Sequence, residues 1–140
     1  MKKIILILIF SITILLGNNI HLIEVDGIIN PASSKFIISS IEKAEDKMAE
    51  CLIIQLDTPG GLMTSMHDII KTELNSKIPI IVYVAPSGSR AASAGVFITM
   101  ASHVAAMAKS TNIGAAHPVN IGGGIFGNKA KSDSANVEMD

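Results

Sequence analysis

The chain has 140 residues, of which 49% are hydrophobic and 4% aromatic, and it carries a formal net charge of −1. This length allows one domain at most, and the balance of 11 basic and 12 acidic residues excludes a strongly basic, nucleic-acid-binding protein. The single cysteine excludes an internal disulfide and a cysteine-based metal cluster, and we expect neither a metal nor a cofactor.

An apolar segment opens the chain. Lys2 and Lys3 precede a run of 13 residues, 4–16, in which Ser11 and Thr13 are the only polar side chains. Basic residues before a short apolar run are typical of a secretory signal, and the run is shorter than the roughly 20 residues that span a bilayer. Residues 15–17 read Leu-Leu-Gly and lack the small-x-small pattern of a cleavage site. We therefore expect residues 1–19 to be a signal peptide or an uncleaved membrane anchor, with the remaining chain exported from the cytoplasm.

The next residues predict a strand, a helix and a second strand. Residues 20–25 read as a strand, and Asn30 followed by Pro31 is a typical helix start. One face of this helix carries apolar side chains at helical spacing: Phe36, Ile37, Ile41, Ala44 and Met48. Residues 51–56 form a short apolar run that predicts a buried parallel strand, with Cys51 as a buried structural thiol.

The alternation continues along the chain. A second amphipathic helix carries Leu62, Met66, Ile69, Ile70 and Leu74. Residues 80–84 predict a third strand, residues 92–102 a helix and residues 104–108 a fourth strand. This order predicts an α/β fold with a mainly parallel sheet. From residue 113 the chain is rich in glycine and polar residues, which predicts a long surface loop. Four strands leave an unfinished sheet edge, so we expect a domain that is incomplete at its C-terminal end.

Two glycine-containing turns follow predicted strands and precede helices. Residues 57–61 read Asp-Thr-Pro-Gly-Gly, and residues 91–95 read Ala-Ala-Ser-Ala-Gly. Such turns can be ordinary connections, but ligands bind beyond the carboxyl ends of parallel strands, where both turns lie. Ser93, among small neighbours at a helix start, is the candidate nucleophile. The backbone N–H groups of Gly61 and Ala94 are the candidate oxyanion-hole donors.

The general base is less clear from the residues. The chain has four histidines: His21, His67, His103 and His117. His117 follows Ser93 by 24 residues in the predicted loop and is the candidate alternative base. Three lysines also lie within reach along the chain: Lys109, Lys129 and Lys131. A catalytic lysine must be desolvated to lower its pKa, and the polar surroundings of the last two disfavour that.

Three motifs in order resemble the NfeD membrane-bound serine proteases of the ClpP/crotonase superfamily, which are distantly similar to signal peptide peptidase A. The motifs are residues 57–61, residues 91–95, and residues 113–118, which read Ile-Gly-Ala-Ala-His-Pro. The resemblance covers roughly residues 20–140 and implies a ClpP-like spiral of ββα units and a Ser–Lys dyad endopeptidase. Ser93 matches the nucleophile, and Gly61 and Ala94 match the oxyanion-hole positions. His117 then becomes a loop residue, because the stretch resembles NfeD more closely than ClpP.

The resemblance also bears on the base and the substrate. Residues 137–140 resemble the run that precedes the family's dyad lysine, which implies that this chain ends at or before its general base. We therefore expect residues 20–140 to be the N-terminal, incomplete part of a ClpP-like serine protease domain. The expected function is cleavage of apolar segments of membrane-associated proteins, with a stomatin-like protein as partner and a homo-oligomer, in the simplest case a dimer, as the assembly. A catalytically inactive fragment and a crotonase-like acyl-binding module are the alternatives.

Overall fold

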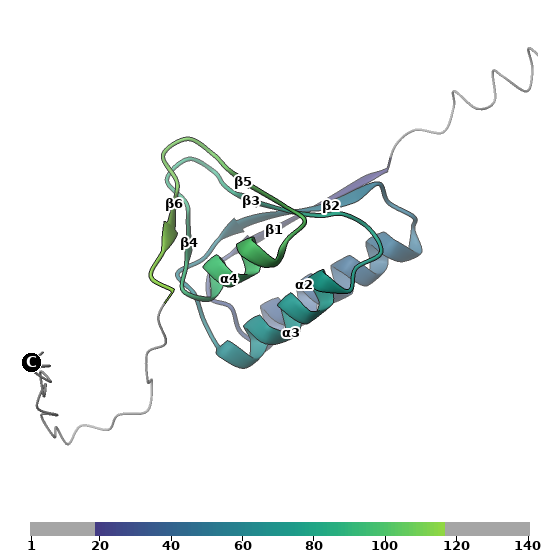
Figure 1. The fold of residues 1–140 in the computed structure, drawn as a ribbon, viewed down its shortest axis with the longest axis horizontal. Helices are drawn as coiled ribbons and strands as arrows, with labels where there is room; N and C mark the ends of the chain where they lie inside the picture. Colours follow the sequence, from purple (N-terminus) through teal and green to yellow (C-terminus); the bar gives the residue numbers. More distant parts are fainter. Residues whose placement is uncertain (1–18, 117–140) are drawn as a thin grey trace, which may run out of the picture.

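A computed structural model describes residues 19–116, which form nine elements (Figure 1). In chain order they are β1 (Ile20–Asp26), α2 (Pro31–Asp46), β2 (Cys51–Asp57), α3 (Met63–Leu74), β3 (Ile80–Val84), β4 (Arg90–Ala92), α4 (Ala94–Ala101), β5 (Val104–Met107) and β6 (Asn112–Gly114). Within this part of the chain, no helix is long and apolar enough to span a bilayer. The predicted signal or anchor segment lies outside the described residues.

The strands form two parallel sheets. Four of them make one sheet in the order β1-β2-β3-β5, and β4 pairs with β6 in a second, smaller sheet. Helices α2, α3 and α4 lie on one side of the larger sheet (Figure 1). The predicted α/β alternation and parallel sheet are confirmed. The smaller sheet was not predicted, and β6 occupies residues that we expected to begin a loop.

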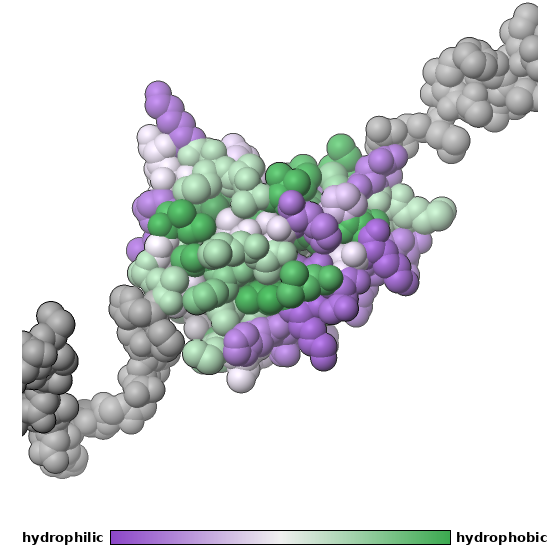
Figure 2. Space-filling model, in the orientation of Figure 1, coloured by the Kyte–Doolittle hydropathy of each residue, from purple (hydrophilic) through white to green (hydrophobic). Residues whose placement is uncertain are grey.

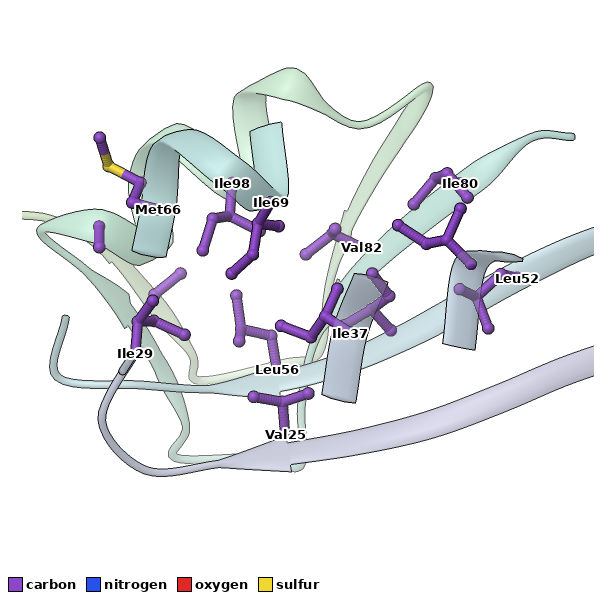
Figure 3. Close-up of a cluster of buried hydrophobic side chains, with 14 of the residues drawn as sticks. Val25, Ile29, Ile37, Leu52, Leu56, Met66, Ile69, Ile80, Val82 and Ile98 are labelled. Atoms are coloured by element: carbon purple, nitrogen blue, oxygen red, sulfur yellow. The ribbon is translucent and has the colours of Figure 1, made fainter. Parts of the chain in front are cut away.

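The core lies between the larger sheet and the three helices. Strands β2 and β3 alternate between buried and half-buried residues, so that Leu52, Leu56 and Val82 point toward the helices. Ile37 of α2, Ile69 of α3 and Ile98 of α4 face them (Figure 3). Full burial of one such side chain stabilises the fold by about 1.5–3 kcal/mol. The core is therefore aliphatic, as the scarcity of aromatic residues requires.

Several predicted core positions are not buried. Met48 is 86% exposed, because α2 already ends at Asp46 and the chain turns at Met48 with a φ of 51°. Phe36 and Leu74 are also exposed. Cys51 is half-buried, because it alternates with the buried Leu52 and so points to the opposite face of β2. The prediction of a buried thiol was therefore wrong.

The start of α2 follows the predicted capping chemistry. Asn30 is the N-cap, and its Oδ1 accepts hydrogen bonds from the N–H groups of Ala32 at 2.9 Å and Ser33 at 3.0 Å. The Ser33 hydroxyl completes a capping box by accepting from the Asn30 N–H at 2.8 Å. A cap of this kind contributes about 1 kcal/mol. It also fixes the turn that carries Ile29, which contacts the candidate site.

The buried carboxyl group of Glu73 leads us to predict that the free energy of unfolding depends on pH. The side chain is fully buried on α3, and neither carboxyl oxygen has a hydrogen-bond partner among the described residues. Burial raises its pKa from 4.5 to about 8. Between these values the folded chain keeps the proton and the unfolded chain loses it, so the free energy of unfolding falls as pH rises, by up to about 1.4 kcal/mol per pH unit.

The variant Glu73→Gln removes the titrating group and keeps the shape of the side chain. We expect urea denaturation between about pH 5 and about pH 8 to show a shallower decline of the unfolding free energy for this variant than for the wild type. The exposed Glu42 on α2 serves as the control, and Glu42→Gln should keep the wild-type slope. Equal slopes for wild type and Glu73→Gln would refute this reading of Glu73.

Candidate active site

Ser93 occupies the turn between β4 and α4. Its backbone has φ 51° and ψ −112°, a conformation that costs a residue with a side chain on the order of 1–3 kcal/mol. The turn is held because the Ser93 N–H donates to the carbonyl oxygen of Gly114 at 3.0 Å and the Val96 N–H donates to the carbonyl oxygen of Ser93 at 3.0 Å. A strained strand-to-helix turn of this type is the geometry of a nucleophile elbow, which presents a serine hydroxyl. The Ser93 side chain does not cap α4 and is half-buried.

Strand β4 brings Ser93 next to the end of β2. The Thr58 N–H donates to the carbonyl oxygen of Arg90 at 2.7 Å, and the Ala92 N–H donates to the carbonyl oxygen of Thr58 at 3.0 Å. The Asp57 carboxylate accepts a further hydrogen bond from the Arg90 N–H at 3.0 Å. On the other side β4 pairs with β6. The turn that carries Ser93 is thus fixed by backbone hydrogen bonds on both sides of β4.

The first turn of α4 packs closely because its residues are small. A Cβ atom at Gly95 would lie 2.5 Å from Cγ2 of Thr58 and 3.4 Å from Cβ of Ala91. A side chain at position 95 would therefore push α4, and Ser93 with it, away from the end of β2. The small residues around Ser93 serve this close approach.

The turn after β2 touches the serine directly. Gly60 has φ 113°, and a Cβ atom there would lie 2.7 Å from Cβ of Ser93 and 3.2 Å from its Oγ. A Cβ at Gly61 would collide with the carbonyl oxygen of Ile29. Glycine is therefore required at both positions for different reasons: Gly60 makes room for the serine, and Gly61 for the β1–α2 turn.

Two backbone N–H groups in the turns that meet at Ser93, those of Gly61 and Ala94, have no acceptor among residues 19–116. Ile29 donates to the carbonyl oxygen of Gly60 at 2.8 Å and accepts from the Leu62 N–H at 2.8 Å, so the N–H of Gly61 between them points away from Ile29. The N–H of Ala94 belongs to the first residue of α4, which has no partner within the helix. Neither N–H donates to any residue that the structure describes. Two N–H donors without an acceptor among the described residues, in turns that meet at a serine, are suited to form an oxyanion hole.

The described residues do not supply a base for Ser93. Nδ1 of His103 accepts a hydrogen bond from the Ile80 N–H at 3.1 Å, which gives this histidine a structural role. His67 is exposed on α3. Within residues 19–116 no histidine or lysine forms a hydrogen bond with the Ser93 hydroxyl, and no group of histidine, cysteine and acidic residues could hold a metal. Lys109 is exposed. The remaining candidates, His117, Lys129 and Lys131, lie outside the described residues, as does the run 137–140 that resembles the segment before the family's dyad lysine.

A protein-family model and several relatives, some of them named as membrane proteins or proteases, match the chain. A family model described as "NfeD1b, N-terminal domain" matches residues 19–139. The chain is 42% identical over 123 residues to "Membrane-bound protease PH1510" of Pyrococcus horikoshii, with 85% of this chain and 28% of the relative covered. It is 32% identical over 113 residues to "Membrane protein NfeD1b" of Bacillus subtilis, with 81% and 25% covered. The chain thus spans about a quarter of the length of these relatives.

Solved structures show the same fold. A serine-to-alanine mutant of "1510-N membrane-bound stomatin-specific protease" superposes with a TM-score of 0.73 at 41% identity, covering 75% of this chain and 51% of that chain. A lysine-to-alanine mutant of the same protease, in complex with a substrate peptide, superposes with a TM-score of 0.73 at 42% identity, covering 75% of this chain and 48% of that chain. ClpP1 of Listeria monocytogenes superposes with a TM-score of 0.59 at 18% identity, covering 66% of this chain and 55% of that chain. This similarity shows a shared fold alone. The ClpP-like fold expected from the sequence is confirmed.

Proposed function

We propose, because this chain belongs to the NfeD1b N-terminal domain family, that it carries the nucleophile and the oxyanion hole of a membrane-associated serine endopeptidase. The observation that carries the proposal is the contact between the two turns. Gly60 lies against the Ser93 side chain at a strained elbow, and the N–H groups of the residues that follow them, Gly61 and Ala94, have no acceptor among the described residues. Relatives named as membrane-bound and stomatin-specific proteases support the reaction class.

In the proposed reaction, Ser93 Oγ attacks the carbonyl carbon of the scissile peptide bond while a base takes the hydroxyl proton. The carbonyl oxygen becomes an anion that accepts hydrogen bonds from the N–H groups of Gly61 and Ala94, each contributing about 3 kcal/mol to lowering the barrier. The C–N bond then breaks, the base returns the proton to the leaving amine, and an acyl-enzyme remains. Water hydrolyses this ester and restores the Ser93 hydroxyl.

The proposed base is a lysine from outside residues 19–116, which makes a Ser–Lys dyad. The resemblance to the NfeD proteases supports this choice. The pair of relatives solved as a serine-to-alanine and a lysine-to-alanine mutant, the latter with a substrate peptide, supports it as well. Such a lysine needs an apolar environment that lowers its pKa, because only the neutral amine accepts a proton. His117 is the alternative base.

We further propose the setting of this reaction. Residues 1–19 act as a signal peptide or membrane anchor, and residues 20–140 belong to a serine protease domain outside the cytoplasm. The substrate is an apolar segment of a membrane-associated protein, with a stomatin-like protein as the expected partner. Large apolar side chains stay exposed on α3 and α4, among them Leu74, Phe97 and Met100. Apolar surface gathers over the helices in Figure 2. Such a surface supports a homo-oligomer, in the simplest case a dimer.

Peptide cleavage tests the proposal. Wild-type protein that includes the proposed dyad lysine is incubated with a peptide from an apolar segment of a stomatin-like protein and with a polar peptide of equal length, and the products are identified by mass spectrometry. We expect cleavage of the apolar peptide within its apolar run, and an intact polar peptide. No cleavage of the apolar peptide, or equal cleavage of both peptides, contradicts the proposal.

A further inference from the structure

Thr58 is a buried threonine whose hydroxyl closes the turn after β2. The residue has no exposed surface. Its Oγ1 accepts a hydrogen bond from the N–H of Gly60 at 3.1 Å and donates one to the carbonyl oxygen of Gly60 at 3.3 Å. Threonine hydroxyls close turns over their own backbone in this way. The hydroxyl thus holds both polar groups of the glycine that touches Ser93.

The rest of Thr58 contacts the other half of the candidate site. Its Cγ2 lies where a side chain at Gly95 would point, 2.5 Å from the Cβ position. Its backbone pairs with β4 through Arg90 and Ala92, immediately before Ser93. One residue therefore contacts the turn that carries Gly61 through its hydroxyl, and the turn that carries Ser93 and Ala94 through its methyl group and backbone.

We propose that Thr58 is a positioning residue whose hydroxyl fixes the Gly60–Gly61 turn, and with it the Gly61 N–H, against Ser93. The proposal rests on the proposed function of these groups. Two consecutive glycines have wide conformational freedom, and the hydrogen bonds of Ile29 engage the Gly60 carbonyl and the Leu62 N–H but leave the Gly60 N–H to Thr58. Without the Thr58 hydroxyl, the buried N–H of Gly60 loses its partner. The turn can then relax, and the two oxyanion donors no longer converge on one oxygen.

A purely structural role and a positioning role for Thr58 predict opposite effects of two substitutions on the labelling rate. Thr58→Val keeps the shape and the methyl group over Gly95 and removes the hydroxyl. Thr58→Ser keeps the hydroxyl and removes the methyl group. If Thr58 only packs, Thr58→Val should keep the wild-type labelling rate and Thr58→Ser should lower it. If the hydroxyl positions the turn, Thr58→Val should lower the labelling rate and Thr58→Ser should keep it. Thr99 provides a matched control, because it is also a buried threonine whose hydroxyl donates to a backbone oxygen, that of Gly95 at 2.7 Å.

The experiment measures the rate of covalent labelling of the 140-residue chain by a fluorophosphonate, together with the hydrogen-exchange rate of the Gly60 N–H by NMR. We expect Thr58→Val to lower the maximal labelling rate about 100-fold, with little change in the probe concentration at half-maximal rate, because small misplacements of reacting groups have effects of this size. Its Gly60 N–H should exchange faster than in the wild type. Thr58→Ser and Thr99→Val should label within about threefold of the wild type, and circular dichroism verifies that each variant is folded.

The proposal is overturned if Thr58→Val labels at the wild-type rate, or if Thr58→Ser and Thr58→Val lose the same fraction of the labelling rate. A wild-type chain that fails to label contradicts the proposed function of Ser93 instead. The Gly60 exchange rate then still decides for Thr58, since an unchanged rate in Thr58→Val overturns its role in holding the turn.

Discussion

Replacing Ser93 by alanine abolishes covalent labelling of the chain by a fluorophosphonate, with an expected loss of at least about a thousandfold in rate. The variant removes the hydroxyl that we propose forms the bond to the probe and leaves the packing of the residue unchanged, because the Ser93 Oγ makes no hydrogen bond to a residue that the structure describes. Alanine also fits the elbow no worse than serine. The rate is followed by in-gel fluorescence of the labelled protein.

Ser87, which lies on the preceding β3–β4 connection, provides the control. Ser87 is exposed, and its Oγ donates to the carbonyl oxygen of Lys109 at 2.7 Å. Ser87→Ala should label at the wild-type rate. If Ser93→Ala keeps the labelling, or if Ser87→Ala loses it, the nucleophile has been assigned to the wrong residue.

Gly60→Ala should lose both labelling and stability. A Cβ at position 60 would meet Cβ of Ser93 at 2.7 Å, closer than two such atoms can approach, so one of the two turns must move. Displacement of the reacting groups by about 1 Å lowers the rate about 100-fold, and overpacking of a tight site costs about 1–3 kcal/mol. Labelling kinetics and urea denaturation measure the two effects.

Gly88→Ala separates the steric effect from backbone strain. Gly88 also has a positive φ, 93° against 113° for Gly60, but a Cβ there meets nothing within 4 Å. Both variants therefore bear the conformational cost of about 1–2 kcal/mol for a side chain at positive φ. Only Gly60→Ala should slow labelling. Equal labelling rates in the two variants would show that Gly60 does not abut the side chain that reacts with the probe.

Much of the fold follows from local patterns. The Asn30 cap, the buried strands β2 and β3 and the alternation of strands and helices were all predicted correctly. These features depend on neighbouring residues or on simple periodicity. Strands β4 and β6 were missed, because three residues are too few to show an alternation. They form only because they pair with each other and β4 also pairs with Thr58.

The sequence predicted which residues belong to the candidate site. It did not predict which of them contact one another. Small residues around Ser93 and the glycine pair in residues 57–61 are visible in the sequence. Which glycine lies against the serine, and which against Ile29, depends on the meeting of three segments. The hydroxyl of Thr58 could not be assigned for the same reason. Glu73 has no distinguishing local signal, because a glutamate on an amphipathic helix is normally solvated.

Peptide mapping of the fluorophosphonate adduct tests the central claim most directly, which is that Ser93 is a nucleophile in a preformed oxyanion hole. Trypsin cleavage after Arg90 and Lys109 releases residues 91–109, in which Ser93 and Ser102 are the only serines, and fragment ions distinguish them. An oxyanion hole alone retains a roughly 10³–10⁴-fold acceleration over water, so labelling is expected even if the chain lacks its base. We predict one probe per chain, attached to Ser93; an unmodified 91–109 peptide, or a probe on Ser102, would contradict the claim.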